Sequence, residues 1–379
     1  MQTEYIGNSS IENIKKLISD LDHKRVLIVT GKKSFKESSS KLKLSKLLKG
    51  FEVERFSDFD VNPNIDDVQI GINKIRLFEP EIIIAIGGGS VIDIAKLINI
   101  LAANTTKDSN LHELIMDSTF VSKKGLPLIA IPTTSGTGSE ATHFAVIYIK
   151  NKKYSFAHKY VKPEFAIIDP SLSFSTSPYV AACSAFDALS QAIESFWSVG
   201  STEESRQYSR TSISMILNSI ESAINLKETN AMESMSIAAN LAGKAINISK
   251  TTAAHAISYP ITKQMGIPHG HAVALTLGKF FIINYCNNKE LINDYRGHSH
   301  LINIMQELFD MFNVSNAEDC CKKWLDLMST IGLANDLPKI FKEKSINYEL
   351  IASDINIERL QNNPIKVTSI QIKNLFYHK

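Results

Sequence analysis

Four short apolar runs alternate with helical patterns in the first half of the sequence. The runs are bounded by turn residues and are Val26–Thr30, Ile82–Ile86, Leu128–Ile131 and Phe165–Ile168. Short runs of this composition are typical of parallel strands that are buried on both faces. Because helical patterns separate the runs, they predict a doubly wound α/β domain with a Rossmann-like parallel sheet.

After Asp169-Pro170 the sequence changes to long helical patterns. These cover Pro178–Ser198, Glu203–Leu226 and Asn230–Ser249. They predict an all-α second domain, so we expect an α/β domain at residues 1–175 and a helical domain at 176–379. A chain of 379 residues with 44% hydrophobic content is long enough to bury a core in each domain.

The charge balance excludes some classes of partner. With 41 basic and 39 acidic residues, the net charge is +2, and we expect neither a nucleic acid nor a membrane as partner. The basic run Lys32–Lys49 is interpreted as a solvated helix. No apolar run approaches the roughly 18 residues of a membrane span, and a cytoplasmic location is expected. The cysteines lack metal-type spacing and are interpreted as reduced core residues: Cys183, Cys286, Cys320 and Cys321.

Gly87-Gly88-Gly89-Ser90 lies between the run Ile82–Ile86 and a predicted helix at Val91–Ala103. Glycines let backbone amides approach a phosphate, and a helix N-terminus adds positive partial charge. The placement predicts a dinucleotide cradle, although a tight turn alone also needs glycine. A second polar cluster, Pro132–Glu140, follows another strand. Its hydroxyl groups either line the rest of the nucleotide groove or cap the next helix, and they belong to Thr133, Thr134, Thr137 and Ser139.

Asp187 and Gln191 are four residues apart in a predicted helix, so they project from one face. Two later histidines, His255 and His269, would complete a four-ligand metal site. The alternative is that Asp187 caps or solvates its helix and that both histidines are ordinary polar residues.

Together, Gly87–Lys96, Pro132–Glu140, Phe186–Glu194 and Pro268-His269-Gly270 resemble the iron-dependent (group III) alcohol dehydrogenase family, whose architecture is shared with dehydroquinate synthase. The resemblance implies a nicotinamide dinucleotide in the first domain, a divalent metal in the second, and substrate between them. It implies Fe²⁺, with Zn²⁺ or Mn²⁺ as alternatives, and a homodimer. It also adds Gly31, Asp93 and Lys153 to the cofactor contacts. Family members that prefer NADH often carry an aspartate where Gly31 stands, so we expect NADPH to be accepted as well as NADH.

The sequence departs from the family at two positions. Asp187, His255 and His269 match family ligands, but Gln191 stands where the family has a histidine. An amide oxygen is a weaker donor to iron or zinc than imidazole, so Gln191 either binds the metal less tightly or contacts substrate. Tyr259 replaces a second histidine, on the same helical face as His255. His255 and Tyr259 are therefore the catalytic candidates, with Tyr259, water or a ribose hydroxyl as the proton source.

Lys250-Thr251-Thr252 precedes His255 and supplies a cation and hydroxyls that suit a tetrahedral oxyanion. We expect Thr251, His255 and Tyr259 to form a helical stripe facing the metal. The surrounding sequence resembles the phosphonoacetaldehyde reductase branch, which implies reduction of this phosphonate aldehyde to 2-hydroxyethylphosphonate. The alternatives are another aldehyde or alcohol substrate, a lyase or cyclase of the dehydroquinate synthase type, and a catalytically impaired nucleotide-binding homologue.

Overall fold

A computed structural model describes residues 2–37, 39–106, 109–150, 152–285, 288–355 and 357–377. The chain divides into two units, Met1–Thr176 and Ser177–Lys379. The predicted boundary at residue 175 lies beside this division. Among the described residues, no helix combines the length and the apolar character that a membrane crossing requires.

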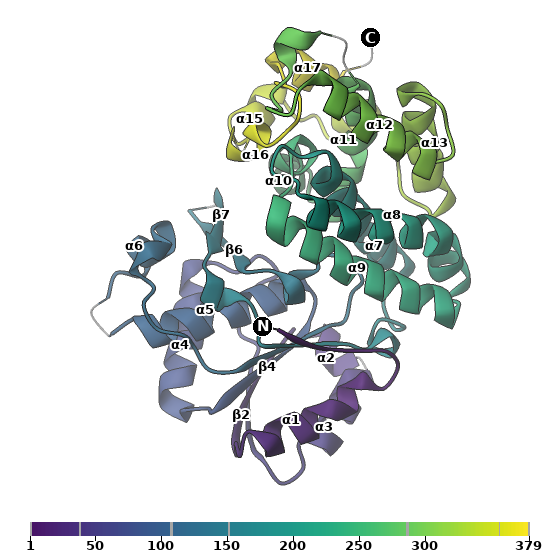
Figure 1. Cartoon of the computed structure of the whole chain (residues 1–379). Coiled ribbons are helices and arrows are strands. Elements are labelled where there is room, and N and C mark those ends of the chain that lie inside the picture. The colour runs from purple at the N-terminus through teal and green to yellow at the C-terminus, as the bar shows by residue number, and fades with distance from the viewer. Residues whose placement is uncertain are drawn as a thin grey trace. The chain divides into compact units, whose positions relative to one another are not determined.

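Unit 1 is built on a six-stranded parallel sheet with the order β1-β8-β5-β4-β2-β3 (Figure 1). Its strands are β1 (Thr3–Ile6), β2 (Arg25–Thr30), β3 (Glu52–Phe56), β4 (Ile82–Gly87), β5 (Leu128–Pro132) and β8 (Phe165–Ile168). The predicted parallel sheet is confirmed, and the four apolar runs are its four inner strands. The two edge strands were not predicted, because polar or charged residues interrupt the apolar residues of both β1 and β3.

Helices cover both faces of this sheet (Figure 1). The helices of unit 1 are α1 (Asn13–Asp20), α2 (Ser34–Glu37), α3 (Ser39–Leu47), α4 (Ile65–Phe78), α5 (Gly89–Asn104) and α6 (Leu111–Met116), and an antiparallel hairpin adds β6 (Phe144–Ile149) and β7 (Lys152–Ala157). Alternate residues of β2 face opposite sides: Val26 and Ile28 join the core under α1 and α3, whereas Leu27 and Val29 join the core under α4 and α5.

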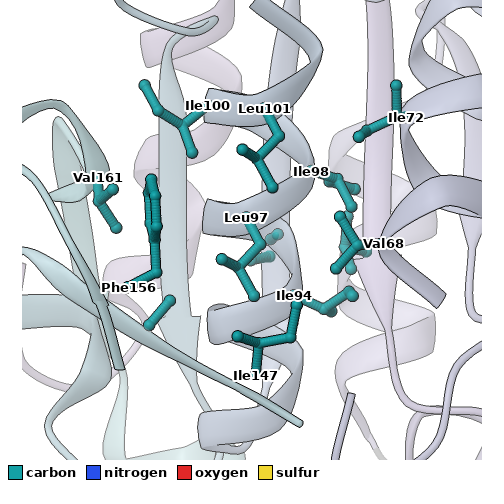
Figure 2. Close-up of a cluster of buried hydrophobic side chains, with 14 of the residues drawn as sticks. Val68, Ile72, Ile94, Leu97, Ile98, Ile100, Leu101, Ile147, Phe156 and Val161 are labelled. Atoms are coloured by element: carbon teal, nitrogen blue, oxygen red, sulfur yellow. The ribbon is translucent and has the colours of Figure 1, made fainter. Parts of the chain in front are cut away.

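Helix α5 is packed on both sides, which fixes the glycine turn at its start. Figure 2 shows Ile98 beside Val68 and Ile72 of α4, with Phe156 of the hairpin on the other side of the helix. The helices approach closely at Gly71, where an added Cβ would lie 2.4 Å from Cγ2 of Ile98. A close-packed helix of this kind holds its N-terminal turn in one position.

Unit 2 is helical among its described residues, as predicted. Its helices are α7 (Pro178–Trp197), α8 (Glu203–Glu221), α9 (Thr229–Ser249), α10 (Ala253–Met265), α11 (His269–Asn284), α12 (His298–Met311), α13 (Ala317–Thr330), α14 (Leu337–Glu343), α15 (Tyr348–Ala352), α16 (Ile357–Gln361) and α17 (Ser369–Asn374). The predicted helix Glu203–Leu226 ends in a π-helical turn at Ser222–Leu226. Every residue of α7 from Ala185 to Trp197 is buried. Polar residues in that stretch therefore need partners inside the protein.

The described cysteines are buried, and the basic run is helical. Cys183, Cys320 and Cys321 are buried free thiols, and burial raises the pKa of Cys183 to about 11. This agrees with a reduced core role, and Cys286 lies outside the described residues. The basic run Lys32–Lys49 contains α2 and α3.

Candidate active site

Helix α7 carries three polar side chains into the core of unit 2. Asp187 and Gln191 are each 4% exposed, and Glu194 is fully buried. The helix begins at Pro178 after the capping residue Ser177, so Asp187 lies in the third turn and does not cap the helix. Spacings of four and three residues place the three side chains along one face.

His255 of α10 and His269 of α11 lie beside Asp187. Oδ1 of Asp187 is 3.5 Å from Nε2 of His255 and 4.0 Å from Nε2 of His269. The three ligand atoms all lie within 4.8 Å of one another. Helix α11 reaches α7 at Gly270, where an added Cβ would lie only 2.0 Å from the backbone oxygen of Cys183. Glycine at this position lets His269 approach Asp187.

Three buried polar atoms at this cluster lack a hydrogen-bond partner within the part of the chain that the structure describes. They are Oδ1 of Asp187, Oε1 of Gln191 and Nε2 of His255. A buried acceptor without a partner is costly, and a bound cation would satisfy all three atoms at once. One carboxylate, two imidazoles and an amide oxygen fit a divalent transition metal. The structure thus brings together Asp187, His255 and His269, three of the four residues predicted to hold the metal, and Gln191 as a ligand stays a prediction.

Glu194 fixes the orientation of His255, a role that the sequence did not reveal. One carboxylate oxygen accepts a hydrogen bond from Nδ1 of His255, and the other accepts from Oγ1 of Thr252 at 2.7 Å and from the backbone N of His255 at 3.2 Å. Because Nδ1 is the donor, Nε2 is left as the acceptor in a neutral ring. A carboxylate behind a ligating histidine is a common arrangement in metal sites. The available signal was a glutamate two helical turns after Asp187.

The electrostatic environment of the cluster favours positive charge. Burial lowers the pKa of His255, but the charge of Glu194 and the interactions with both carboxylates outweigh burial and raise it to about 10. Burial raises the pKa of Asp187, but His255 and the charge of His269 more than offset this effect, so the pKa lies below its usual value. A divalent cation at this position would be stabilised by the same two carboxylates.

Tyr259 and Ser258 border the cluster on the side of His269. The Tyr259 ring stacks on the His269 ring with centroids 5.4 Å apart and an interplanar angle of 24°. Oγ of Ser258 donates to the backbone oxygen of His255 at 2.7 Å and lies 3.3 Å from Nδ1 of His269. Tyr259 is therefore next to a candidate ligand, and its role as a proton donor stays a prediction.

The predicted helical stripe is wrong at its first member. Helix α10 begins at Ala253, so Thr251 precedes the helix that carries His255 and Tyr259. Nδ2 of Asn362 holds this segment through the backbone oxygen of Thr251 at 3.0 Å. Thr251 and Tyr259 therefore do not belong to one helical face.

Thr252 was predicted to bind the anionic group of the substrate, but its hydroxyl is used inside the protein. Its side chain is fully buried, its hydroxyl donates to Glu194, and it accepts from Nε1 of Trp197 at 3.0 Å. The residue thus supports Glu194 and, through it, His255. Lys250 is exposed and directly follows α9 with a positive φ of 61°.

In unit 1, the turns that follow β2 and β4 lie at a reversal of strand order. The chain leaves β2 toward β3 on one side, and it continues from β4 to β5 on the other. Ligands of open α/β sheets bind at such reversals, outside the carboxyl ends of the strands. Gly31 follows β2, and Gly87–Ser90 follow β4. Helix α5 begins at Gly89 without a side-chain cap.

The glycine turn and the second polar cluster pack against each other. An added Cβ at Gly89 would lie 2.7 Å from Cγ2 of Thr137, and one at Gly88 would lie 3.6 Å from Oγ1 of Thr134. Two partly exposed threonines therefore border the uncapped helix N-terminus. Backbone amides, glycines and hydroxyls in this arrangement fit a pyrophosphate.

Three further predicted cofactor contacts lie in or near this region. Thr133 donates its backbone N–H to the oxygen of Gly87 at 3.0 Å, which ties the two turns together. The Ser90 hydroxyl donates to the backbone oxygen of Val61. Lys153 lies on β7 and is partly exposed. The cofactor roles of Ser90 and Lys153 stay predictions.

Asp93 and Ser139 are hydrogen-bonded to each other in unit 1, and their role at the cofactor stays a prediction. Oγ of Ser139 donates to Asp93 at 2.5 Å, and Asp93 also accepts from the backbone N of Val146 at 3.0 Å. Nζ of Lys96, which is 1% exposed, donates to Oγ of Ser139 at 3.0 Å and to Oγ1 of Thr142 at 2.9 Å. This network ties α5 to Ser139, at the end of the second polar cluster, and to Val146 of β6.

Several proteins are similar to this chain over about two thirds of its length or more. Long-chain-alcohol dehydrogenase 1 of Geobacillus thermodenitrificans is 30% identical over 79% of this chain and 77% of the relative. Phosphonoacetaldehyde reductase of Streptomyces viridochromogenes is also 30% identical, over 64% of this chain and 63% of the relative. The crystal structure of sulfoacetaldehyde reductase from Bifidobacterium kashiwanohense in complex with NAD⁺ matches with a TM-score of 0.85 and 28% identity, covering 99% of this chain and 96% of that one.

Family comparison covers both units. The family described as iron-containing alcohol dehydrogenase matches residues 2–170, and the C-terminal region of the Fe-containing alcohol dehydrogenase family matches residues 181–379. Both matches agree with the parallel sheet of unit 1 and the helical unit 2. The chain therefore belongs to the iron-containing alcohol dehydrogenase family.

Proposed function

We propose that this protein is an iron-dependent aldehyde reductase that uses NADPH or NADH and reduces phosphonoacetaldehyde to 2-hydroxyethylphosphonate. The observation that carries the metal dependence is the set of three buried polar atoms, on Asp187, Gln191 and His255, that have no hydrogen-bond partner among the described residues, with His269 beside them. A divalent cation supplies Lewis acidity toward an aldehyde oxygen, and a reduced nicotinamide supplies the hydride.

The residues of the chain have distinct tasks in this scheme. Asp187 contributes the negative charge that retains a cation, and Glu194 holds the proton on Nδ1 of His255, so that Nε2 is the nitrogen that would bind the cation. Tyr259, stacked on His269, would donate the proton that the aldehyde oxygen needs once hydride has reached the carbon. The glycine turns after β2 and β4 would bind the dinucleotide phosphates.

The proposed substrate rests on the anionic group. Two of the relatives are named for small aldehydes that carry such a group, a phosphonate in one and a sulfonate in the other. Lys250 supplies an exposed cation five residues before His255. A second candidate, an uncharged aldehyde or alcohol, is favoured by the equally similar long-chain-alcohol dehydrogenase.

A substrate comparison separates the two candidates. The protein is stripped of metal, reloaded with Fe²⁺, Zn²⁺ or Mn²⁺, and assayed for NADPH and NADH oxidation with phosphonoacetaldehyde, sulfoacetaldehyde, acetaldehyde and a long-chain aldehyde. We expect the highest kcat/KM for phosphonoacetaldehyde. A higher value for the uncharged aldehydes would favour the second candidate.

Lys250→Ala tests the anion contact, with Lys322→Ala on α13 as a matched control. A lost charge-assisted hydrogen bond is worth on the order of 1.5–3 kcal/mol, which corresponds to about a tenfold to hundredfold fall in kcat/KM. We expect this fall for the phosphonate only. Equal losses with acetaldehyde would show that Lys250 supports the fold rather than the substrate.

We also propose that the enzyme is a homodimer. Sedimentation velocity of the metal-loaded protein over a range of concentrations checks this proposal. A single monomeric species at micromolar concentration would contradict it.

A further inference from the structure

We propose that Arg55 makes the adenosine end of the dinucleotide site selective for a 2′-phosphate, so that NADPH binds more tightly than NADH. This inference rests on the proposed dinucleotide site of unit 1. Arg55 lies on β3, opposite Ile28 of β2. Its Nε donates to Oγ1 of Thr30 at 2.7 Å, and its Nη2 donates to the backbone oxygen of Gly31 at 2.8 Å. The guanidinium is thus attached to the turn that follows β2.

The charge of Arg55 has no carboxylate partner within ion-pair distance in the described part of the chain. Its neighbour Glu54 points to the other face of the sheet, where it pairs with Lys74 of α4. The guanidinium instead lies over the Phe35 ring, 5.2 Å from the centroid. A partly buried cation without a counterion stabilises an anion that binds beside it.

The turn itself adds to this preference. Gly31 carries no carboxylate that would accept the ribose hydroxyls and repel a 2′-phosphate. The next two residues, Lys32 and Lys33, are both exposed and basic. Flexible lysines contribute charge, whereas Arg55 is held by three hydrogen bonds, to Oγ1 of Thr30 and to the backbone oxygens of Gly31 and Lys32, and keeps further N–H donors in a fixed plane. Arg55 is therefore the residue of this group that is oriented before a ligand arrives.

A binding titration tests Arg55 without depending on turnover. The full-length protein is titrated calorimetrically with adenosine 2′,5′-bisphosphate and with ADP, and then with NADPH and NADH. We expect Arg55→Met to weaken the two ligands that carry a 2′-phosphate by about tenfold to a hundredfold and to change the affinity for ADP and NADH less than twofold. Arg55→Lys should give an intermediate loss, because it keeps the charge and loses the planar donors.

Arg76→Met is the matched control, because Arg76 is another arginine of unit 1, and its guanidinium donates to the backbone oxygen of Thr105, which follows α5. It should leave all four affinities unchanged. Retained ADP binding by Arg55→Met shows that the turn after β2 is intact. Equal affinity of the natural protein for both adenosine ligands, or equal weakening of both by Arg55→Met, would overturn the role of Arg55. Failure of the natural protein to bind any of the four ligands would instead overturn the dinucleotide site.

Discussion

Replacing Glu194 with glutamine should disable the metal site while keeping the size of the side chain. Both oxygens of Glu194 accept hydrogen bonds, one from Nδ1 of His255 and the other from Thr252 and the backbone N of His255. A glutamine can place its oxygen on only one of these sides. If its NH₂ faces Nδ1, His255 must accept there and carry its proton on Nε2, which then cannot bind a metal. If the NH₂ faces Thr252, two buried donors oppose each other.

The size of the effect follows from the burial of Glu194. Loss of a carboxylate behind a ligating histidine typically lowers metal affinity 10- to 100-fold, or about 1.4–2.7 kcal/mol. A buried donor left without an acceptor costs roughly a further 1–3 kcal/mol of folding free energy. Glu194→Gln should therefore bind metal more weakly and also unfold at a lower denaturant concentration than the natural protein.

Competition with a chelator of known affinity measures the metal dissociation constant, with Zn²⁺ and Mn²⁺ titrated separately. Glu307→Gln on α12 is the control, because it makes the same exchange at a partly exposed carboxylate that pairs with Arg210. Near-ultraviolet circular dichroism confirms that each variant is folded. A folded Glu194→Gln protein whose metal affinity stays within twofold of the natural value would refute the reasoning.

Three further predictions concern the ligands, the helix contact and a buried lysine. His269→Ala should lose tight metal binding and turnover together, and a normal metal content in this variant would show that His269 is not a ligand. Gln191→His should tighten metal binding, because imidazole is the stronger donor, and weaker binding would show that Gln191 is not a ligand. Gly270→Ala would place a Cβ 2.0 Å from the backbone oxygen of Cys183. It should lower the free energy of unfolding of unit 2 by about 1–3 kcal/mol. An unchanged urea midpoint would contradict the close approach of α11 to α7. Burial lowers the pKa of Lys96 to about 8 from 10.5, so between these values the unfolded chain binds more protons than the folded one. Compared with Lys96→Met, the natural protein should therefore gain stability as the pH rises across this window, and a pH-independent difference in urea unfolding would show that the pKa of Lys96 is not lowered.

The sequence by itself determined the features that depend on local spacing. Apolar runs of four or five residues predicted the inner strands, because a strand buried on both faces must be apolar throughout. Glycines between a strand and a helix predicted the turn at Gly87–Ser90. The four-residue spacing of Asp187 and Gln191 placed both side chains on one helical face before the helix was observed. Similarity to known motifs supplied His255 and His269.

Only the tertiary structure decided which polar residues face the proposed ligands and which support the fold. Glu194 and Thr252 are 58 positions apart, and their hydrogen bond depends on how α7 packs against the start of α10. The same holds for Asp93 and Ser139, which lie on different segments of unit 1 and are joined by a hydrogen bond. Helical and strand periodicity fixes the direction of a side chain within its own element. It does not specify the partner that the side chain meets on another element, because that partner is set by the packing of the whole core.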